Sequence, residues 1–253
     1  MTNKHAINNS KHSTNNSLLT NFAFTLAETL IVMGIIGVVA ALTLPNLNSS
    51  TGDKEKIAKL KKVYSNLNDA YGRATAVYGP FTEWGLTGEE HEKRCKKVAE
   101  RLTEFMKISK SCGYQGTNGT CFSSGITKYS DGTNSTWIPD LGYDYILSDG
   151  TSISIESDTN FIGVDVDLDG PNKGKHQLGT DHFYFSVDED KKENGFIPYS
   201  QDNVAACIGS KGANCTAWVI EFDNMDYLKA DNSGKCNNNT SRVLDGVSNI
   251  TCK

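Results

Sequence analysis

Residues 24–45 read FTLAETLIVMGIIGVVAALTLP, and this stretch carries the strongest structural signal in the chain. The 21 residues before Pro45 contain no Lys, Arg or Asp, and their single charged side chain is Glu28. As a helix rising about 1.5 Å per residue, they extend over about 32 Å, close to the thickness of the hydrocarbon core of a bilayer. A carboxylate at that depth costs about 2.5 kcal/mol or more unless it is paired, so the sequence predicts a partner for Glu28.

The order AFTLAE at residues 23–28, followed by an apolar run and Pro45, resembles the N-terminal signal of type IV pilins and type II secretion pseudopilins. The resemblance implies that a prepilin peptidase cuts between Ala23 and Phe24 and that the new Phe24 amine is methylated. The family usually has Gly before the cut, and Ala23 departs from that pattern. The resemblance also makes Glu28 and Pro45 assembly residues, with Glu28 meeting the Phe24 amine of another subunit.

Composition and charge exclude several other classes of protein. The chain has 253 residues, of which 38% are apolar and 9% aromatic, as expected of one folded domain with one membrane segment. The leader, residues 1–23, contains two lysines and no acidic residue, so its removal changes the formal charge from −5 to −7. An acidic mature chain argues against a nucleic-acid partner. The positive leader is expected in the cytoplasm, and everything after Pro45 on the far side of the membrane.

The sequence predicts four parts: a cleaved leader at 1–23, a transmembrane and assembly helix at 24–45, the amphipathic half of the same helix at 46–79, and a globular periplasmic or extracellular domain at 80–253. Pro45 is expected to kink the helix. In the amphipathic half, apolar residues recur every three or four positions and form one continuous stripe. The stripe contains Ile57, Leu60, Tyr64, Leu67, Tyr71, Ala74 and Tyr78, widened by Val63, Ala70 and Val77.

The globular part is expected to contain a helix at 89–110 and an antiparallel sheet of about four strands. Segments 143–148 and 151–156 flank Asp149-Gly150, which predicts a hairpin with a type I′ turn. Further strands are predicted at 161–168, 182–187 and 216–222. The resulting fold class is α+β and pilin-like: a long N-terminal helix, with a membrane half and an amphipathic half, packed on a small antiparallel sheet with disulfide-closed loops.

All seven cysteines follow Pro45 and are expected in an oxidising compartment, where they form disulfides. An odd number leaves at least one free thiol. The short loop between Cys112 and Cys121 suits a disulfide-closed turn, although the sequence leaves the pairing open. His91 and Cys95 stand four residues apart on a helix, but two ligands without a third and fourth are a weak sign of a metal site.

The stretch DVDLDGP, which begins at Asp165, is the second candidate site. The pattern D-x-D-x-D-G is the front half of a calcium-binding loop, so Asp165, Asp167 and Asp169 are candidate ligands. His176 stands where an EF-hand has Glu, and Asp181 is the candidate that closes a different geometry. The segment is also similar to an acidic loop of major pseudopilins, some of which hold calcium. The alternative is an acidic strand edge without a ligand, so no cofactor is required and calcium is a candidate.

Enzymatic motifs such as HExxH, GxSxG and a phosphate-binding glycine loop are missing from the sequence, which therefore predicts a protein that is not an enzyme. The expected function is a structural subunit of a type II secretion pseudopilus or a type IV pilus. Its expected partners are other pilin or pseudopilin subunits, the prepilin peptidase, an inner-membrane assembly platform and the membrane. The subunit is expected to cross the inner membrane once, with a periplasmic C-terminal domain, and then to enter a periplasmic or surface filament.

The alternative function is a monomeric single-pass, membrane-anchored binding protein or enzyme with an exported calcium-binding ectodomain. That protein would keep its leader and would not polymerise. The two hypotheses therefore differ in the N-terminus of the chain.

We predict that the mature chain begins at Phe24 and carries one additional methyl group on its amine. Intact-mass measurement of protein from native membranes checks this directly. Replacing Ala23→Leu should abolish the cleavage, because the peptidase acts on a small residue before the cut. A native mass that still includes residues 1–23 would contradict the pilin resemblance.

Overall fold

A computed structural model describes residues 25–116, 120–122, 127–136, 142–189, 194–201 and 203–252, without the side chains of 40–51. The chain divides into two compact units, residues 1–48 and residues 49–253, and each is described by itself. The predicted cleavage site between Ala23 and Phe24 lies outside the described residues. The side chain of Pro45, and with it the expected kink, also lies outside them.

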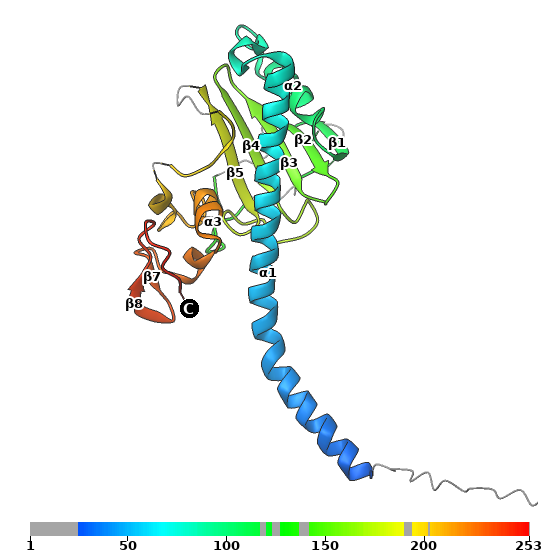
Figure 1. Ribbon diagram of the computed structural model, residues 1–253, viewed down its shortest axis with the longest axis vertical. Helices are drawn as coiled ribbons and strands as arrows, with labels where there is room; N and C mark the ends of the chain where they lie inside the picture. Colours follow the sequence, from blue (N-terminus) through cyan, green and yellow to red (C-terminus); the bar gives the residue numbers. More distant parts are fainter. Residues whose placement is uncertain are drawn as a thin grey trace, which may run out of the picture. The chain divides into compact units, whose positions relative to one another are not determined.

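Helix α1 extends over Leu26–Tyr78 and contributes to both units (Figure 1). In the first unit, its large apolar side chains at residues 26–39 are exposed. In the second unit, the stripe on α1 is mostly buried: Leu60, Val63 and Leu67 are inaccessible to solvent, whereas Val77 is 61% exposed. Val77 therefore does not belong to the buried stripe, contrary to the sequence prediction.

The expected fold class, a pilin-like α+β fold whose N-terminal helix has a membrane half, is wrong. Among the residues that the structure describes, no helix is both long and apolar enough to cross a membrane. The apolar part of α1 with described side chains, residues 26–39, rises about 21 Å, which is less than the roughly 30 Å of a hydrocarbon core. The sheet is also larger than the small one expected.

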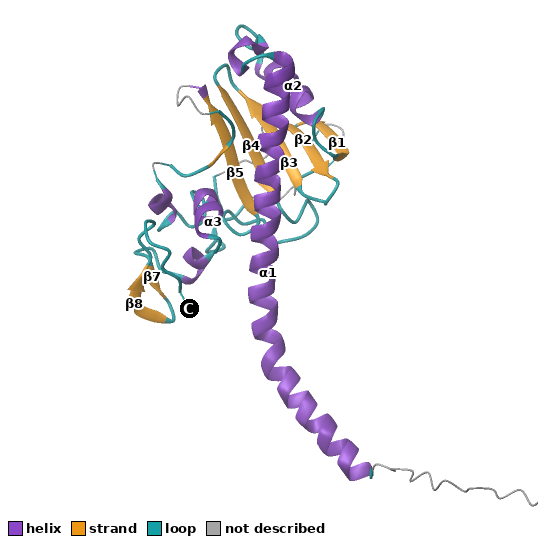
Figure 2. Cartoon of the chain, viewed as in Figure 1, coloured by secondary structure: helices purple, strands orange, loops and turns teal. Residues whose placement is uncertain are grey.

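The main sheet has six strands in the order β1-β2-β3-β4-β5-β6, and all neighbouring pairs are antiparallel (Figure 2). Its strands are β1 Ile108–Tyr114, β2 Tyr143–Leu147, β3 Ser152–Ser157, β4 Phe161–Asp167, β5 His182–Asp188 and β6 Ile197–Pro198. A second sheet pairs β7 (Lys235–Cys236) with β8 (Asn239–Val243). Each strand of the main sheet follows its neighbour in the chain, so the sheet is a simple meander.

One face of the main sheet packs against α1 within the second unit (Figure 1). The rings of Tyr64 and Phe185 stack with their centroids 5.5 Å apart. Val164 and Val166 on β4 belong to the same apolar core as the α1 stripe. Because side chains alternate along a strand, Asp165, which stands between these valines, lies on the opposite face.

The other helices formed by the described residues are α2 (His91–Thr103), α3 (Thr216–Phe222) and the 3-10 helices η1 (Phe81–Trp84), η3 (Val204–Cys207) and η4 (Asp226–Lys229). The helix predicted at 89–110 ends early, and β1 begins at Ile108 instead. The strand predicted at 216–222 is wrong, because this segment is α3. Five of its seven residues are buried, namely Thr216, Ala217, Trp218, Val219 and Phe222. Of these, Trp218, Val219 and Phe222 are spaced to share one face of a helical turn.

The predicted hairpin around Asp149-Gly150 is confirmed as β2–β3, but its turn differs from the prediction. A type I′ turn needs positive φ at two consecutive residues, whereas only Gly150 has one, at 84°. The N–H of Leu147 donates to the carbonyl of Thr151, which closes a longer loop. Lys62 on α1 forms an ion pair with Asp149 at 2.8 Å and so ties this loop to the helix.

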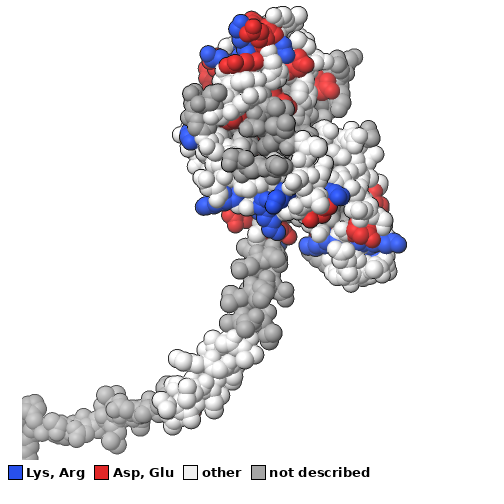
Figure 3. Space-filling view, turned by 180° about the vertical axis from the view of Figure 1, so that it is seen from behind, with Lys and Arg blue, Asp and Glu red and all other residues white. Residues whose placement is uncertain are grey.

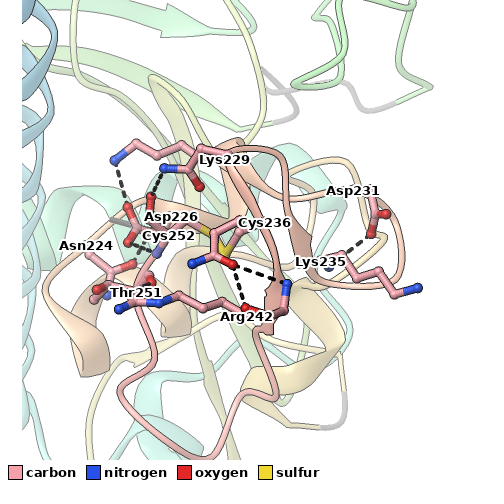
Figure 4. Close-up of a disulfide and its surroundings, with 12 residues drawn as sticks. Asn224, Asp226, Lys229, Asp231, Lys235, Cys236, Arg242, Thr251 and Cys252 are labelled. Atoms are coloured by element: carbon pink, nitrogen blue, oxygen red, sulfur yellow. Dashed lines mark hydrogen bonds and ion pairs between the residues drawn. A yellow bond between two sulfur atoms is a disulfide. The ribbon is translucent and has the colours of Figure 1, made fainter.

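The seven cysteines form three disulfides, Cys112–Cys121, Cys207–Cys215 and Cys236–Cys252, and leave Cys95 free. Figure 4 shows the last bridge beside the buried carboxylate of Asp226. That carboxylate accepts the backbone N–H of Cys252 at 2.8 Å and the ammonium of Lys229 at 2.7 Å. Cys252 is thus held by its disulfide, by the hydrogen bond from its N–H to Asp226, and by a hydrogen bond from the Asn238 amide to its carbonyl at 2.9 Å.

We predict that Cys95 does not react with a thiol reagent in the folded chain. Its side chain is buried on α2, and this burial raises the pKa of the thiol, so little thiolate is present near neutral pH. The reaction should be at least about a hundredfold slower in buffer than in denaturant, because it requires opening of the core. In denaturant without a reducing agent, one thiol per chain should react with the reagent, and none should react in Cys95→Ala. Labelling at equal rates in both conditions would contradict this arrangement.

Candidate functional site

The face of the main sheet opposite α1 carries a row of buried polar side chains. They come from alternate positions of three neighbouring strands: Ser152 and Ser154 on β3, Asp165 and Asp167 on β4, and His182, Tyr184 and Ser186 on β5. Residues 120–122 lie close to this face, where the hydroxyl of Ser152 donates to the carbonyl of Cys121 and the ring of Phe122 lies 6.3 Å from that of His182. This face therefore has polar chemistry in a buried setting.

Three side chains of different segments meet at one end of this face. Asp167 ends β4 and pairs in register with His182, the first residue of β5, while His176 comes from the loop between these strands. Asp167 Oδ2 lies 3.3 Å from His182 Nε2 and 3.5 Å from His176 Nδ1. All three atoms lie within 4.8 Å of one another. The three atoms can therefore face one ion.

The three side chains of this cluster are largely buried, which is unusual for polar groups. Asp167 is inaccessible to solvent and His182 is 4% exposed, while the side chain of His176 is 23% exposed. Among the described residues, Asp167 Oδ2, His176 Nδ1 and His182 Nε2 have no hydrogen-bond partner. Buried polar atoms in native proteins are nearly always hydrogen-bonded, so three unsatisfied atoms that face one another indicate a missing partner.

A second carboxylate positions His176. Asp181, which is fully buried, accepts the backbone N–H groups of Lys175, His176 and Gln177 at 2.5, 3.0 and 2.6 Å. His176 has a φ of 52°, in the left-handed region that non-glycine residues seldom adopt. The carboxylate of Asp181 thus stabilises the strained loop that places the His176 ring beside Asp167.

The four aspartates predicted as calcium ligands do not share one arrangement. Asp165 is buried on β4, and Asp169 forms an ion pair with Lys56 of α1 at 3.2 Å. Both oxygens of Asp181 accept backbone N–H groups. Only Asp167 belongs to the three-atom cluster, and its other oxygen, Oδ1, accepts the N–H of Asp169 at 3.0 Å.

Sequence reasoning did not identify either histidine of the cluster as a ligand. In the sequence pattern, His176 stands out only as a departure from the calcium loop, and His182 only as the start of a strand. The available signal was the antiparallel pairing of 161–168 with 182–187, which can place the first residue of one strand opposite an aspartate of the other. That register depends on the residues at which the intervening loop begins and ends, and the sequence does not specify them.

The pair of His91 and Cys95 is a weaker candidate for a metal site. His91 Nδ1 lies 3.0 Å from the hydroxyl of Tyr114 and 3.7 Å from Cys95 Sγ. Cys95 Sγ also accepts the N–H of Ser157 at 3.3 Å. Within the described part of the chain, no third ligand joins His91 and Cys95 in a cluster.

At the start of α1, Glu28 has a local partner. Its Oε2 accepts the backbone N–H and the hydroxyl of Thr25, both at 2.9 Å, while the Thr25 hydroxyl accepts the N–H of Glu28 at 3.2 Å. Reciprocal bonds between the residue before a helix and its third residue form a capping box. Glu28 therefore stabilises the helix start as well as carrying a charge.

Comparisons of this chain with protein-family models, with curated proteins and with solved structures found no match.

We predict that Asp181→Asn lowers the free energy of unfolding by about 2 kcal/mol, because an amide offers one acceptor oxygen where the carboxylate offers two charged ones. Asp69→Asn is the matched control: its carboxylate on α1 is 64% exposed and makes one ion pair, with Arg73, so about 0.5 kcal/mol or less is expected. Urea denaturation in EDTA measures both. Equal stability losses would contradict the role of Asp181 in holding the turn.

Proposed function

We propose that this chain is a structural subunit of a filament, of the type II secretion pseudopilus or type IV pilus class. In this proposal a prepilin peptidase removes residues 1–23 and methylates Phe24. The apolar segment first holds the chain at the inner membrane and then packs among the same segments of other subunits. The observation that carries the proposal is the exposed apolar surface of α1 in the first unit.

That surface is large and surrounds the helix. Its exposed large apolar side chains are Leu26, Leu30, Ile31, Val32, Met33, Ile35, Ile36, Val38 and Val39, each between 53% and 81% accessible. Residues 30–33 are consecutive and therefore point in all directions around the axis, at about 100° per residue. On the face drawn in Figure 3, this part of α1 is white, whereas charged side chains are scattered over the second unit.

An apolar surface on all sides of a helix requires cover on all sides. One partner on one side leaves the rest exposed, whereas lipid or a bundle of parallel neighbours surrounds the helix. In sequence, the apolar run continues through residues 40–44. These features support polymerisation through the N-terminal helix rather than a simple pairwise contact.

Glu28 has two roles in this proposal. Its hydrogen bonds with Thr25 cap the helix, and its negative charge attracts the positive Phe24 amine of a neighbouring subunit. The second role depends on charge and the first does not, because Gln serves as well as Glu in a capping box. Substitutions can therefore separate the two.

We predict that Glu28→Gln keeps the helix cap but reduces incorporation into filaments about tenfold or more, equivalent to about 1.4 kcal/mol lost per pairing. Thr25→Ala is the matched control, because it removes the cap hydroxyl and keeps the charge; its incorporation should stay within about twofold of the wild type. The measurement compares subunits in sheared filaments with subunits left in membranes, in cells with the assembly machinery, after cleavage at Ala23 has been confirmed for each variant.

Normal incorporation of Glu28→Gln together with a loss for Thr25→Ala would make Glu28 a helix cap only. Filaments that never contain the wild-type chain, together with a leader that remains uncleaved, would instead support the monomeric membrane-anchored alternative.

A further inference from the structure

We propose that Asp167, His176 and His182 bind a divalent transition-metal ion of the zinc class, which fixes the loop between β4 and β5 to the sheet. The proposal does not depend on the filament function. It rests on the donor types, the distances among the three atoms and their lack of other partners.

The donor set selects the class of ion. Two imidazole nitrogens and one carboxylate oxygen suit zinc and its first-row neighbours, whereas calcium takes six to eight oxygen ligands. In the structure, the carboxylates of Asp169 and Asp181 already have partners in Lys56 and in backbone N–H groups. A calcium ion at Asp169 and Asp181 would compete with these contacts, whereas the histidine cluster uses atoms that are unsatisfied within the described residues.

The distances fit a common ion. Two donor atoms at about 2.1 Å from a tetrahedral zinc ion lie about 3.4 Å apart. Asp167 Oδ2 lies 3.5 Å from His176 Nδ1 and 3.3 Å from His182 Nε2. These separations exceed the 2.7–3.2 Å typical of a direct N–H···O hydrogen bond. These two separations therefore match an ion bound between the carboxylate and each imidazole, and the two imidazole nitrogens lie within 4.8 Å of each other.

The surrounding structure positions two of the three ligands without an ion. Asp167 and His182 face each other on adjacent strands, and the N–H of Leu168 donates to the carbonyl of Asp181 at 2.9 Å. The third ligand, His176, lies on the turn that Asp181 stabilises and is the most exposed of the three. Three protein ligands leave a fourth tetrahedral position, which a water molecule reaching the His176 side can fill.

Binding should stabilise more than the loop itself. Lys59 of α1 donates to the carbonyl of Leu168, and Lys56 pairs with Asp169 at 3.2 Å. An ion that fixes Asp167 to His176 therefore also fixes the residues through which the loop contacts α1. The expected effect is a more stable second unit, together with protection of its β4–β5 loop.

The test uses the full chain purified in mild detergent, with a histidine-free tag and with His5→Ala and His12→Ala to remove the leader histidines. After EDTA treatment, Zn²⁺, Co²⁺ and Ca²⁺ are titrated separately. Zinc and cobalt should bind one ion per chain, and cobalt should develop the visible absorption bands of nitrogen and oxygen ligation. At a hundredfold excess over its dissociation constant, zinc should raise the melting temperature by about 5–10 °C, and calcium should not.

His176→Gln and His182→Gln should each weaken zinc binding at least about tenfold, because the loss of even an outer-shell partner of a metal ligand typically costs about 10- to 100-fold in affinity. His91→Gln is the matched control and should bind zinc as the parent does. Circular dichroism in EDTA verifies that each variant is folded; His176→Gln, at the most exposed ligand, keeps the test valid if His182→Gln unfolds.

Several results would overturn the proposal. A calcium-dependent shift without a zinc- or cobalt-dependent one would assign the loop to oxygen ligands. No shift with any ion would leave the three side chains as a buried polar cluster without a metal. Loss of binding in His91→Gln, with normal binding in both other variants, would place the metal beside Cys95.

Discussion

Burial of the α1 stripe against one face of the main sheet is the interaction on which the rest of the second unit depends. Leu60, Val63 and Leu67 are fully buried there, and each such side chain contributes about 1.5–3 kcal/mol relative to exposure. Because strand residues alternate, placing Val164 and Val166 against α1 turns Asp165 and Asp167 to the opposite face. The same packing that builds the core thus also creates the buried polar face.

This packing covers only part of the apolar surface of α1. Its side chains at 26–39 remain exposed in the first unit, while the stripe at 57–74 is mostly buried in the second. The exposed segment calls for cover from lipid or from other chains, and the Thr25–Glu28 cap gives it a defined start. The proposed filament and the proposed metal site are consequences of different parts of the same helix and sheet, and either can hold without the other.

The stripe on α1 and the β2–β3 hairpin could be predicted from sequence because both depend on local periodicity. The wrong prediction of a strand at 216–222 shows the limit of such local patterns. The β-branched and aromatic residues of this segment favour a strand, but Trp218 and Phe222 are buried in the core on a short helix. The His176–His182–Asp167 cluster could not be predicted for a related reason. It needs the register of β4 with β5 and a left-handed turn at His176, and both are tertiary features.

The central claim is that copies of this chain cover one another at residues 26–39, and photo-crosslinking in cells tests it most directly. A photoreactive amino acid at Ile35, which is 59% exposed, is compared with one at Val77, which is 61% exposed but lies in the second unit. With active assembly machinery, the Ile35 probe should give a ladder of crosslinked multiples of this chain, and the ladder should vanish when the assembly ATPase is inactive. A single uncrosslinked chain in both conditions, with probe incorporation verified, would contradict the account.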